Sequence, residues 1–395
     1  MARLGDVCEI LNGYAFKSEN YIDKGIRIIR ISNVQKGYIE DNTPVFYSFD
    51  DINVTKYQLL EGDLLISLTG NVGRVGYLDK KFLPAALNQR VACIRIKDSA
   101  VLDKSFLFNL LNSDSFEQKC ILSSKGVAQK NMSAEWLKDY KIPLPPLDEQ
   151  RKIAAVLDKV SDLIAKRRQQ LDKLDEMVKS RFVEMFGDLA DPDCKYMRYK
   201  LEETCVSSDD IKCGPFGTQL NKNEYQDHGI AVWEIPQINS EFKIFPTHFL
   251  TSEKAKQLDA YSLIPGDIAM SRKGNVGRCA LFPKNFAPGI IHSDVLRIRV
   301  DNRRVNPCFL MYQLHFSKAV THQIEMVSSG AVMAGINVTK LKQIYIHIPA
   351  FDLQQQFSNF AEQVEKTKTT ISRSLDKLET LKKALMQEYF GEKIC

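Results

Sequence analysis

The sequence predicts an α+β protein in which two similar globular domains are joined by two long antiparallel helices that pair as a coiled coil. Three features predict this architecture. An internal repeat recurs at one offset, strand-like segments alternate with Gly, Pro and Asn in each half, and a heptad pattern of apolar residues follows each half. A chain of 395 residues is also longer than a single hydrophobic core usually supports.

The internal repeat relates the two halves of the chain at an offset of 204 residues. EGDLLISLTGNVGR at 61–74 matches PGDIAMSRKGNVGR at 265–278. The same offset relates GIRIIRISNV (25–34) to GIAVWEIPQI (229–238), IPLPPLDEQ (142–150) to IHIPAFDLQ (346–354), and LDKLDEMVKSRFVEMFGD (171–188) to LDKLETLKKALMQEYFGE (375–392). Since these matches share one order and one spacing, the chain is a tandem duplication.

Each repeat divides into a globular part and a helical part. Short runs such as IRIIRIS at 26–32 and VLRIRV at 295–300 are rich in β-branched residues, which indicates strands with short helices between them. Prolines stand just before Asp148 and Phe351, and no proline interrupts the segments that follow, so a long helix is expected in each. The predicted boundaries are 1–147 and 191–350 for the domains, and 148–190 and 351–395 for the helices.

The helical parts carry apolar residues at steps of three, four or seven, the spacing of a coiled-coil seam. The seam contains Ile153, Leu157, Val160, Ile164, Leu171 and Leu174 in the first helix, and Phe357, Val364, Ile371, Leu375 and Leu378 in the second. Each helix could instead pack on its own domain. The length of the heptad pattern favours pairing of the two helices, which at about 1.5 Å per residue gives a rod of roughly 54 Å.

The composition is that of an ordinary globular protein, with 44% hydrophobic and 26% charged residues, and a net charge of +5 favours an acidic partner only faintly. No apolar run approaches the roughly 20 residues that cross a bilayer, and the N-terminus resembles no signal peptide. The nine cysteines are scattered without a CxxC pair. We therefore expect a cytoplasmic protein with free thiols, no membrane contact and no bound metal.

The sequence lacks the motifs of self-contained enzymes. It contains no HExxH, GxSxG or Walker motif, and Asp191-Pro192-Asp193-Cys194 departs from the [DN]PP[YF] loop of amino-methyltransferases. All six histidines lie in the second repeat, so a histidine-dependent centre would have no counterpart in the first. These observations predict a chain without catalytic residues and without a cofactor of its own.

The sequence GNVGR, at 70–74 and again at 274–278, has two interpretations. A glycine-rich exit from a strand can expose backbone amides to phosphate, with Arg74 or Arg278 adding charge. The glycines can equally serve only to form a tight turn, because the segment matches neither a P-loop nor a dinucleotide-binding fingerprint. From the sequence alone both interpretations stay open.

Loops with Lys, Arg, Asn and Gln recur at equivalent places in both repeats, and such side chains contact base edges or phosphates in nucleic-acid complexes. The candidates in the first repeat are Lys17, Asn33, Arg74, Asn88, Gln89, Arg90, Lys125, Gln129, Lys130 and Asn131. Those in the second repeat are Gln219, Asn221, Lys222, Gln237, Arg272, Lys273, Arg278, His292 and Ser293. Polar loops occur on every protein surface, so recurrence supports these loops as a group rather than any single residue.

Some of these positions differ in charge between the repeats. Arg90 corresponds to Asp294, and Lys130 corresponds to Ala334, at the common offset. Two domains that differ in this way are expected to recognise two different sequences.

The pattern as a whole resembles the specificity subunits of type I restriction–modification systems, over essentially the entire chain. The resemblance rests on GYAFKSENY (13–21), GDLLISLTGNVG (62–73), LNQR (87–90) and above all IPLPPLDEQRKIAAVLDKV (142–160). The second repeat keeps the last motif in altered form, with Ala350, Phe351 and Leu353 in place of Pro146, Leu147 and Glu149.

This resemblance implies that each domain is a target recognition domain that binds one half of a bipartite, asymmetric site in double-stranded DNA. The paired helices would set the spacing between the half-sites. The resemblance also implies partners: two modification (adenine methyltransferase) subunits that bind along the helices and hold S-adenosylmethionine, and restriction (translocase and nuclease) subunits that join the complex.

Two other classes of function are weighed beside this one. A coiled-coil scaffold would bind no DNA sequence selectively, even with its partners present. A self-sufficient methyltransferase or nuclease would bind a cofactor by itself, and the missing motifs argue against it.

Overall fold

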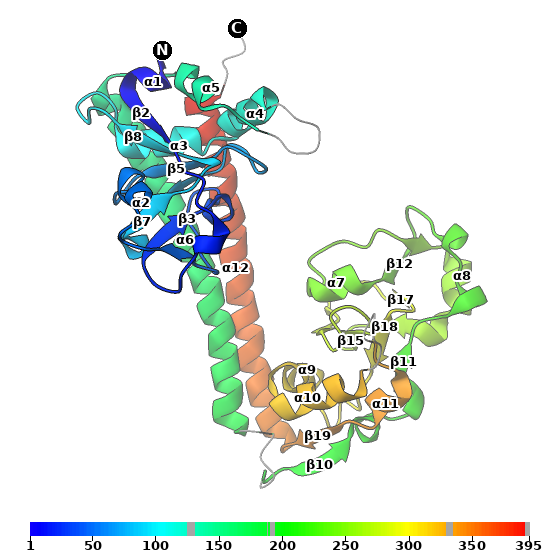
Figure 1. The fold of residues 1–395 in the computed structure, drawn as a ribbon. Coiled ribbons are helices and arrows are strands. Elements are labelled where there is room, and N and C mark those ends of the chain that lie inside the picture. The colour runs from blue at the N-terminus through cyan, green and yellow to red at the C-terminus, as the bar shows by residue number, and fades with distance from the viewer. Residues whose placement is uncertain (125–130, 188, 190–193, 329–334, 392–395) are drawn as a thin grey trace. The chain divides into compact units, whose positions relative to one another are not determined.

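The computed structural model describes residues 1–124, 131–187, 189, 194–328 and 335–391, which form two compact units. Unit 1 comprises Met1–Gln169 and Ser372–Cys395, and unit 2 comprises Gln170–Ile371. Two 40-residue helices, α6 (Leu147–Phe186) and α12 (Phe351–Phe390), each contribute one part to either unit. Figure 1 shows these helices in green and red, and a mixed α+β domain in each unit.

The domain of unit 1 contains two main sheets. The antiparallel sheet has the order β2 (Cys8–Asn12), β8 (Val91–Ile96), β5 (Leu64–Ser67) and β6 (Val75–Tyr77). The second sheet has the order β4 (Phe46–Tyr47), β3 (Ile26–Ile29) and β7 (Ala85–Leu87), with β3 and β7 parallel. The strand β1 (Ala2–Arg3) pairs with β9 (Lys141–Ile142), which joins the two ends of the domain.

Short helices surround these sheets. They are α1 (Leu4–Val7), α2 (Ile52–Lys56), α3 (Lys104–Leu111), α4 (Asp114–Ser123) and α5 (Ala134–Asp139). Side-chain caps begin several of them: Asp103 accepts from the backbone of Phe106, and Ser113 accepts from that of Phe116. Both phenylalanines are buried in the main core, so each cap fixes a helix whose aromatic side chain completes that core.

The domain of unit 2 repeats this topology. One sheet has the order β11 (Ile211–Cys213), β18 (Val295–Ile298), β15 (Ile268–Ser271) and β16 (Cys279–Leu281). The other has the order β13 (Phe249–Leu250), β12 (Ile230–Trp233), β17 (Gly289–Ile291) and β14 (Ser262–Leu263), and β10 (Met197–Lys200) pairs with β19 (Tyr345–Ile348).

The strand registers also repeat. Ser67 faces Val91 in unit 1, and Ser271 faces Val295 in unit 2, at the sequence offset of 204. The helices of this domain are α7 (Ile235–Asn239), α8 (Ser252–Gln257), α9 (Pro307–Phe316), α10 (Lys318–Val327) and α11 (Val338–Lys342). The duplication read from the sequence is therefore a duplication of backbone pairing.

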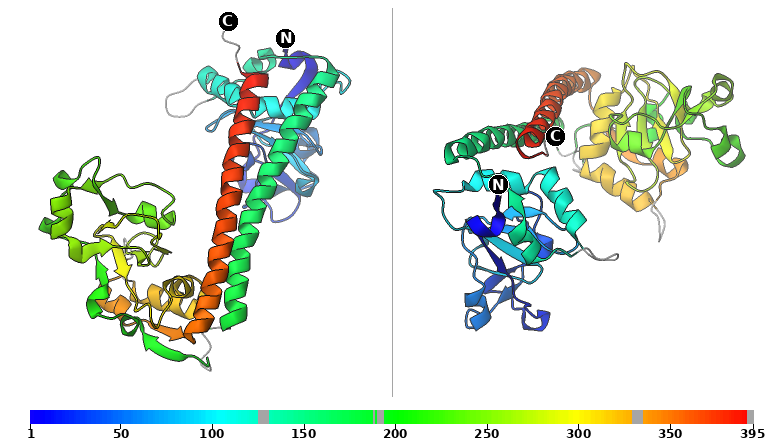
Figure 2. Two further views of the ribbon diagram at one scale, coloured as in Figure 1. Left: turned by 180° about the vertical axis from the view of Figure 1, so that it is seen from behind. Right: turned by 90° about the horizontal axis from the view of Figure 1, so that it is seen from above.

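Within each unit the segments of α6 and α12 run antiparallel (Figure 2). In unit 1, Arg168 pairs with Glu379 at 2.7 Å, while Phe390, near the end of α12, packs on the core beside Ile153. In unit 2, Lys368 pairs with Asp175 at 2.7 Å. The predicted antiparallel pairing of the helices is thus confirmed within each unit.

The predicted seam positions face inward to different degrees. Leu157 and Phe357 are completely buried, and Val160, Ile164 and Val364 nearly so. Ile153, Leu171, Leu174, Ile371, Leu375 and Leu378 are half-buried. The alternative that each helix packs on its own domain also holds in part, because Ala154 lies in the main core of unit 1 and Phe357 in an aromatic core of unit 2.

The aromatic core of unit 2 extends beyond the heptad pattern. Phe182 and Phe186 of α6 contact Phe309 of α9 and Phe357 of α12, with ring centroids 4.8–5.9 Å apart. α6 ends at Phe186, and Gly187 follows with a φ of 73°, a left-handed conformation that glycine adopts without strain. The boundary between the two compact units therefore falls near the middle of each long helix. The boundaries predicted from the sequence lie instead at the helix ends.

A buried glutamine at the start of each long helix connects that helix to the preceding domain. Gln150 donates from Nε2 to the carbonyls of Val101 and Pro145, and its Oε1 accepts from the backbone N–H of Asp103 at 2.8 Å. Both oxygen and nitrogen of this fully buried amide are satisfied. Two of its three hydrogen bonds, those with Val101 and Asp103, join α6 to the loop before α3.

The equivalent residue of the second repeat, Gln354, makes the same three bonds. It donates to the carbonyls of Arg304 and Pro349 and accepts from the backbone N–H of Asn306 at 2.8 Å. Both glutamines end the matching segments 142–150 and 346–354, but the sequence pattern predicts no role for them. The structure assigns both glutamines to holding the helix on the domain.

Gln354→Leu removes a buried amide and leaves one backbone N–H and two carbonyls without their partner. Since each unsatisfied buried group costs about 1–3 kcal/mol, we expect the free energy of unfolding to fall by about 2–4 kcal/mol, measured by urea denaturation. The neighbouring Gln355 is exposed. Gln355→Leu is therefore the matched control, with an expected change within about 0.5 kcal/mol; equal effects of the two variants would contradict the role given to Gln354.

Candidate nucleic-acid interface

Four segments of unit 1 meet at one end of the antiparallel sheet through backbone hydrogen bonds. The N–H of Gln89 donates to the carbonyl of Tyr14 at 2.7 Å, and the N–H of Leu68 donates to the carbonyl of Arg90 at 2.9 Å. The N–H of Met132 donates to the carbonyl of Leu68 at 2.8 Å. We call this place junction 1; it comprises Tyr14, Leu68, Thr69, Asn88, Gln89, Arg90, Asn131 and Met132.

Unit 2 contains the equivalent arrangement. The N–H of Arg272 donates to the carbonyl of Asp294 at 2.9 Å, and the N–H of Ile336 donates to the carbonyl of Arg272 at 3.1 Å. These bonds are the counterparts, at the same offset, of those from Leu68 and Met132. We call this place junction 2; it comprises Gly214, Phe216, Arg272, Lys273, His292, Ser293, Asp294, Gly335 and Ile336.

A glycine is required where the first segment crosses each junction. A Cβ atom added to Gly13 would lie 1.9 Å from the carbonyl oxygen of Asn88, and one added to Gly214 would lie 2.3 Å from that of His292. Only a residue without a side chain can pass so close to another backbone. The structure thus brings together the GYAFK and GPFG segments with the LNQR and IHSD loops, four of the segments that the sequence selected.

The predicted residues of junction 1 differ in exposure. Gln89 and Arg90 are exposed, and so is Lys17, which lies 3.4 Å from Glu19. Asn131 is exposed and pairs in a β-bridge with Thr69, whereas Asn88 is only 8% exposed. Gln89 and Arg90 therefore present the polar surface of this junction. Lys125, Gln129 and Lys130 lie outside the described residues.

The polar side chains of junction 2 make more contacts within the domain than those of junction 1. The Arg272 guanidinium lies 4.8 Å from the centre of the Phe216 ring and donates to the carbonyls of Ile336 and Ser293. Lys273 pairs with Asp294 at 2.8 Å. His292 and Ser293 are half-buried, and Nδ1 of His292 accepts from the backbone N–H of Asp294.

Three further candidates of the second repeat lie on the loop after Phe216. Gln219, Asn221 and Lys222 are exposed. Gln219 accepts hydrogen bonds from the Tyr261 hydroxyl at 3.0 Å and from the backbone N–H of Phe216. Asn221 and Lys222 keep their side chains at the surface.

Two other candidates, Asn33 and Gln237, have their side chains in the interior. Asn33 is 3% exposed, donates to the carbonyl of Glu40 and to the Asp41 carboxylate, and accepts from the backbone of Arg30. Gln237 is 2% exposed, donates to the carbonyl of Phe245 and accepts from the backbone of Glu234. Both amides use their hydrogen bonds to close loops within the domain.

The GNVGR segments form tight turns, at the hairpin between β5 and β6 and at the one between β15 and β16. In both copies the two glycines have left-handed φ values, 70° and 85° in the first copy and 68° and 84° in the second. A Cβ on Gly73 would lie 2.8 Å from Cβ of Cys120, and one on Gly277 would lie 2.9 Å from Cγ2 of Ile324. Because the turn packs against α4 or α10, the structure favours the turn interpretation.

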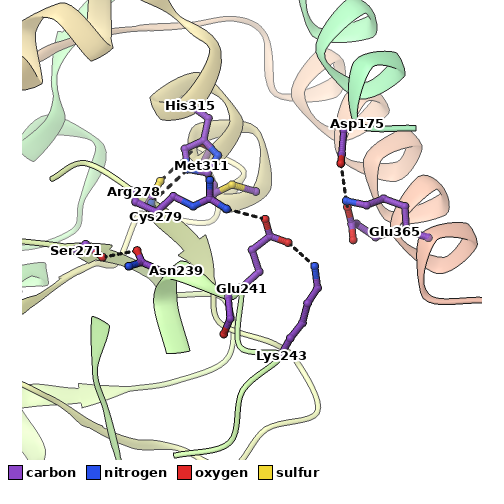
Figure 3. Close-up of polar contacts among 12 residues, drawn as sticks. Asp175, Asn239, Glu241, Lys243, Ser271, Arg278, Cys279, Met311, His315 and Glu365 are labelled. Atoms are coloured by element: carbon purple, nitrogen blue, oxygen red, sulfur yellow. Dashed lines mark hydrogen bonds and ion pairs between the residues drawn. The ribbon is translucent and has the colours of Figure 1, made fainter. Parts of the chain in front are cut away.

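The two arginines of GNVGR are engaged within their own domains. Arg74 donates from Nη1 to Gln35 at 2.8 Å. Arg278 donates to Glu241, whose other oxygen accepts from Lys243 at 2.9 Å, so this carboxylate lies between two cations (Figure 3). These cations lower the pKa of Glu241 against the opposing effect of its burial. Both arginines are thus less available to a ligand than Arg90.

The residue after Arg278 adds a further anchor. The backbone N–H of Cys279 donates to Nε2 of His315 at 3.2 Å, which requires this nitrogen to be unprotonated (Figure 3). Burial lowers the pKa of His315, and the nearby Arg278 lowers it further, so the ring is neutral as the bond demands. The β15–β16 hairpin is therefore fixed to α9.

Among the described residues no group of His, Cys, Asp and Glu has the arrangement of a metal site. Burial raises the pKa of the Cys8, Cys120 and Cys279 thiols to about 12, so none of these three is a thiolate nucleophile at neutral pH. No helix of the described chain is long and apolar enough to cross a membrane.

Comparison with known sequences matches most of the chain to one family. The family described as type I restriction modification DNA specificity domain matches residues 1–175 and 210–380. The putative type I restriction enzyme MjaX specificity subunit of Methanocaldococcus jannaschii is 25% identical, over 99% of this chain and 92% of its own length. The type I restriction enzyme EcoBI specificity subunit of Escherichia coli is 23% identical, over 98% and 84%.

Solved structures share the fold. The S subunit of a type I restriction–modification system from M. genitalium has a TM-score of 0.61 at 14% identity, covering 99% of this chain and 96% of that one. A chain from a structure concerned with complex assembly and conformational transition of the type I system has a TM-score of 0.57 at 18% identity, covering 98% and 96%. At these identities the likeness establishes the architecture.

If the GNVGR segment serves as a turn, replacing its glycines should lower stability, and the loss should be larger where a Cβ atom would contact a neighbouring helix. Gly274 and Gly277 both have left-handed φ values, but a Cβ on Gly274 meets open space. We expect Gly274→Ala to cost about 1–2 kcal/mol of unfolding free energy from the backbone alone, and Gly277→Ala about 1–3 kcal/mol more from overpacking against α10. Urea denaturation measures both; a larger loss for Gly274→Ala would contradict the packing of the turn.

Proposed function

The chain belongs to the family of type I restriction–modification DNA specificity proteins, and from this premise we propose that each of its domains recognises one half of a bipartite target in double-stranded DNA. The chain would act without catalytic residues of its own, directing adenine methylation and cleavage by partner subunits. The observation that carries the proposal is that junctions 1 and 2 have equivalent backbone hydrogen bonds but different side chains at their surfaces.

The difference between the junctions supports an asymmetric target. Junction 1 presents Gln89 and Arg90, whereas the place of Arg90 in junction 2 is taken by Asp294, paired with Lys273. A guanidinium donates hydrogen bonds and a carboxylate accepts them, so the two positions suit different base edges. Two domains with such different surfaces would recognise different half-sites.

The weak net charge of +5 supports a role inside a larger complex. Phosphate contacts provide most of the non-specific affinity of DNA-binding proteins. Partner subunits that surround the DNA would add such contacts, while this chain would contribute the sequence-dependent ones. We propose two modification subunits that bind along α6 and α12 and hold S-adenosylmethionine, and restriction subunits that join them.

The paired helices are proposed to set the spacing between the half-sites. A 40-residue helix is about 60 Å long, and one turn of B-DNA is about 34–36 Å. The glutamine contacts of Gln150 and Gln354 fix how each domain is held on its own helix segment. Helix length would therefore determine how many base pairs remain unread.

The proposed function is tested by methylation sequencing of host DNA with and without this chain, with the modification subunit present. We expect one bipartite, asymmetric adenine-methylated motif that disappears without the chain. Exchange of residues 1–147 for the corresponding domain of a family member should change only one half of that motif. The control exchange of 191–350 should change only the other half. An unchanged motif after both exchanges would exclude recognition by these domains and leave a scaffold role.

Helix length is tested by removing one heptad from the middle of each helix, residues 165–171 and 372–378. Seven residues keep the seam in phase and shorten the pair by about 10.5 Å, or about three base pairs at 3.4 Å each. The unread spacer of the methylated motif should shrink accordingly. Replacing exposed Lys166 and Arg373 by alanine at unchanged length is the control. A constant spacer in the shortened chain would refute the role of the helices.

A further inference from the structure

Arg90 has a backbone conformation that non-glycine residues rarely adopt. Its φ is 69°, in the left-handed region. Among the described residues the other non-glycine positions with positive φ are Glu241 and Phe242, adjacent in one loop of unit 2. Such conformations persist only where the surrounding structure enforces them, and they gather at functional sites.

Junction 1 enforces this conformation from both sides. The carbonyl of Arg90 accepts from the backbone of Leu68 at 2.9 Å, and the N–H of Gln89 donates to Tyr14 at 2.7 Å. Val91, which follows Arg90, and Asn88, two residues before it, are buried. The backbone at Arg90 is therefore fixed while its side chain remains exposed.

The described part of the chain offers the Arg90 side chain neither a hydrogen bond nor an ion pair. Arg74 and Arg278, by contrast, donate to Gln35 and Glu241. A rigid backbone below a guanidinium with free donors is the arrangement expected of a group that binds something outside the domain.

The equivalent position in unit 2 is filled differently. The carbonyl of Asp294 accepts from Arg272 as that of Arg90 does from Leu68, but the Asp294 carboxylate lies 2.8 Å from Lys273 and 3.8 Å from His292. Within the described residues, this position thus carries an unpaired cation on a left-handed backbone in unit 1, and an ion-paired carboxylate without the left-handed φ in unit 2.

We propose, on the basis of the proposed function, that Arg90 is a base-contacting residue of the first domain and specifies a guanine in its half-site. The guanidinium presents two parallel N–H donors, which match the O6 and N7 acceptors of guanine in the major groove. A phosphate contact requires only a nearby charge and would not need the enforced backbone. The ion pair at Asp294 gives the second domain a different requirement at the corresponding base pair.

The test uses the assembled complex of the full chain with its modification subunits, and the target that methylation sequencing identifies. The main variant is Arg90→Gly, because glycine adopts a φ of 69° without strain and so removes the side chain while keeping the backbone. Arg90→Lys keeps the charge but not the paired donors. Lys80→Ala, which removes an exposed cation beyond β6 at the opposite end of the same sheet, is the control.

We expect Arg90→Gly to lower discrimination at one G·C pair of the first half-site by about 5- to 150-fold, measured as methylation rates on DNAs carrying each base there. Arg90→Lys should lose part of this discrimination. The second half-site, the overall fold and the Lys80→Ala complex should be unaffected. Equal stability of Arg90→Gly and the wild type in thermal unfolding separates loss of recognition from loss of structure.

Two results would overturn the assignment of Arg90. One is an unchanged motif in the Arg90→Gly complex. The other is an affinity loss that is equal for every base and lowers the salt dependence of binding by about one ion, as removal of a phosphate contact does. In both cases the wild-type complex still methylates a bipartite motif, so the proposed function survives. Absence of any motif with the wild-type chain would remove the proposed function and this assignment together.

Discussion

A buried amide at the base of each domain is the contact on which the rest of the molecule depends. Gln150 and Gln354 each bond to three backbone groups, two in the preceding domain and one, a proline carbonyl, just before the helix. Removing such a group from water is favourable only when all its hydrogen bonds are made. The satisfied amide therefore permits one arrangement of helix on domain and excludes others nearby.

The hydrophobic cores continue this connection. Ala154 of α6 and Phe390 of α12 pack on the main core of unit 1, and Phe182 and Phe357 pack with α9 in unit 2. The long helices are thus part of each domain's interior as well as partners of one another. A protein that recognises two half-sites needs this rigidity, because a loosely attached domain would tolerate many spacings.

The two domains share equivalent ion pairs with buried carboxylates, whereas polar residues at their surfaces differ. Arg95 pairs with Asp63, and Arg299 pairs with Asp267, each with a shortest distance of 2.7 Å and with a nearly buried carboxylate. Breaking either pair would leave a buried charge, which is strongly destabilising. Arg90 is exposed and Asp294 is half-buried, so a change of side chain there leaves no fully buried charge, and the two positions could diverge between the repeats. The need for stability keeps the buried ion pairs the same in both domains, while surface residues that recognise DNA can differ.

The sequence by itself determined the duplication, the α+β class and the two long helices, because repeats and heptad spacing are local properties of the chain. It also located the loops of both junctions. Only the tertiary structure decided which side chains of those loops are free. Asn33 and Gln237 close loops inside the fold, and Arg74 and Arg278 are held by Gln35 and Glu241, whereas the Arg90 side chain has no hydrogen bond or ion pair with the described residues. These outcomes depend on partners distant in sequence, whose approach is set by strand pairing and core packing, and no local pattern encodes them.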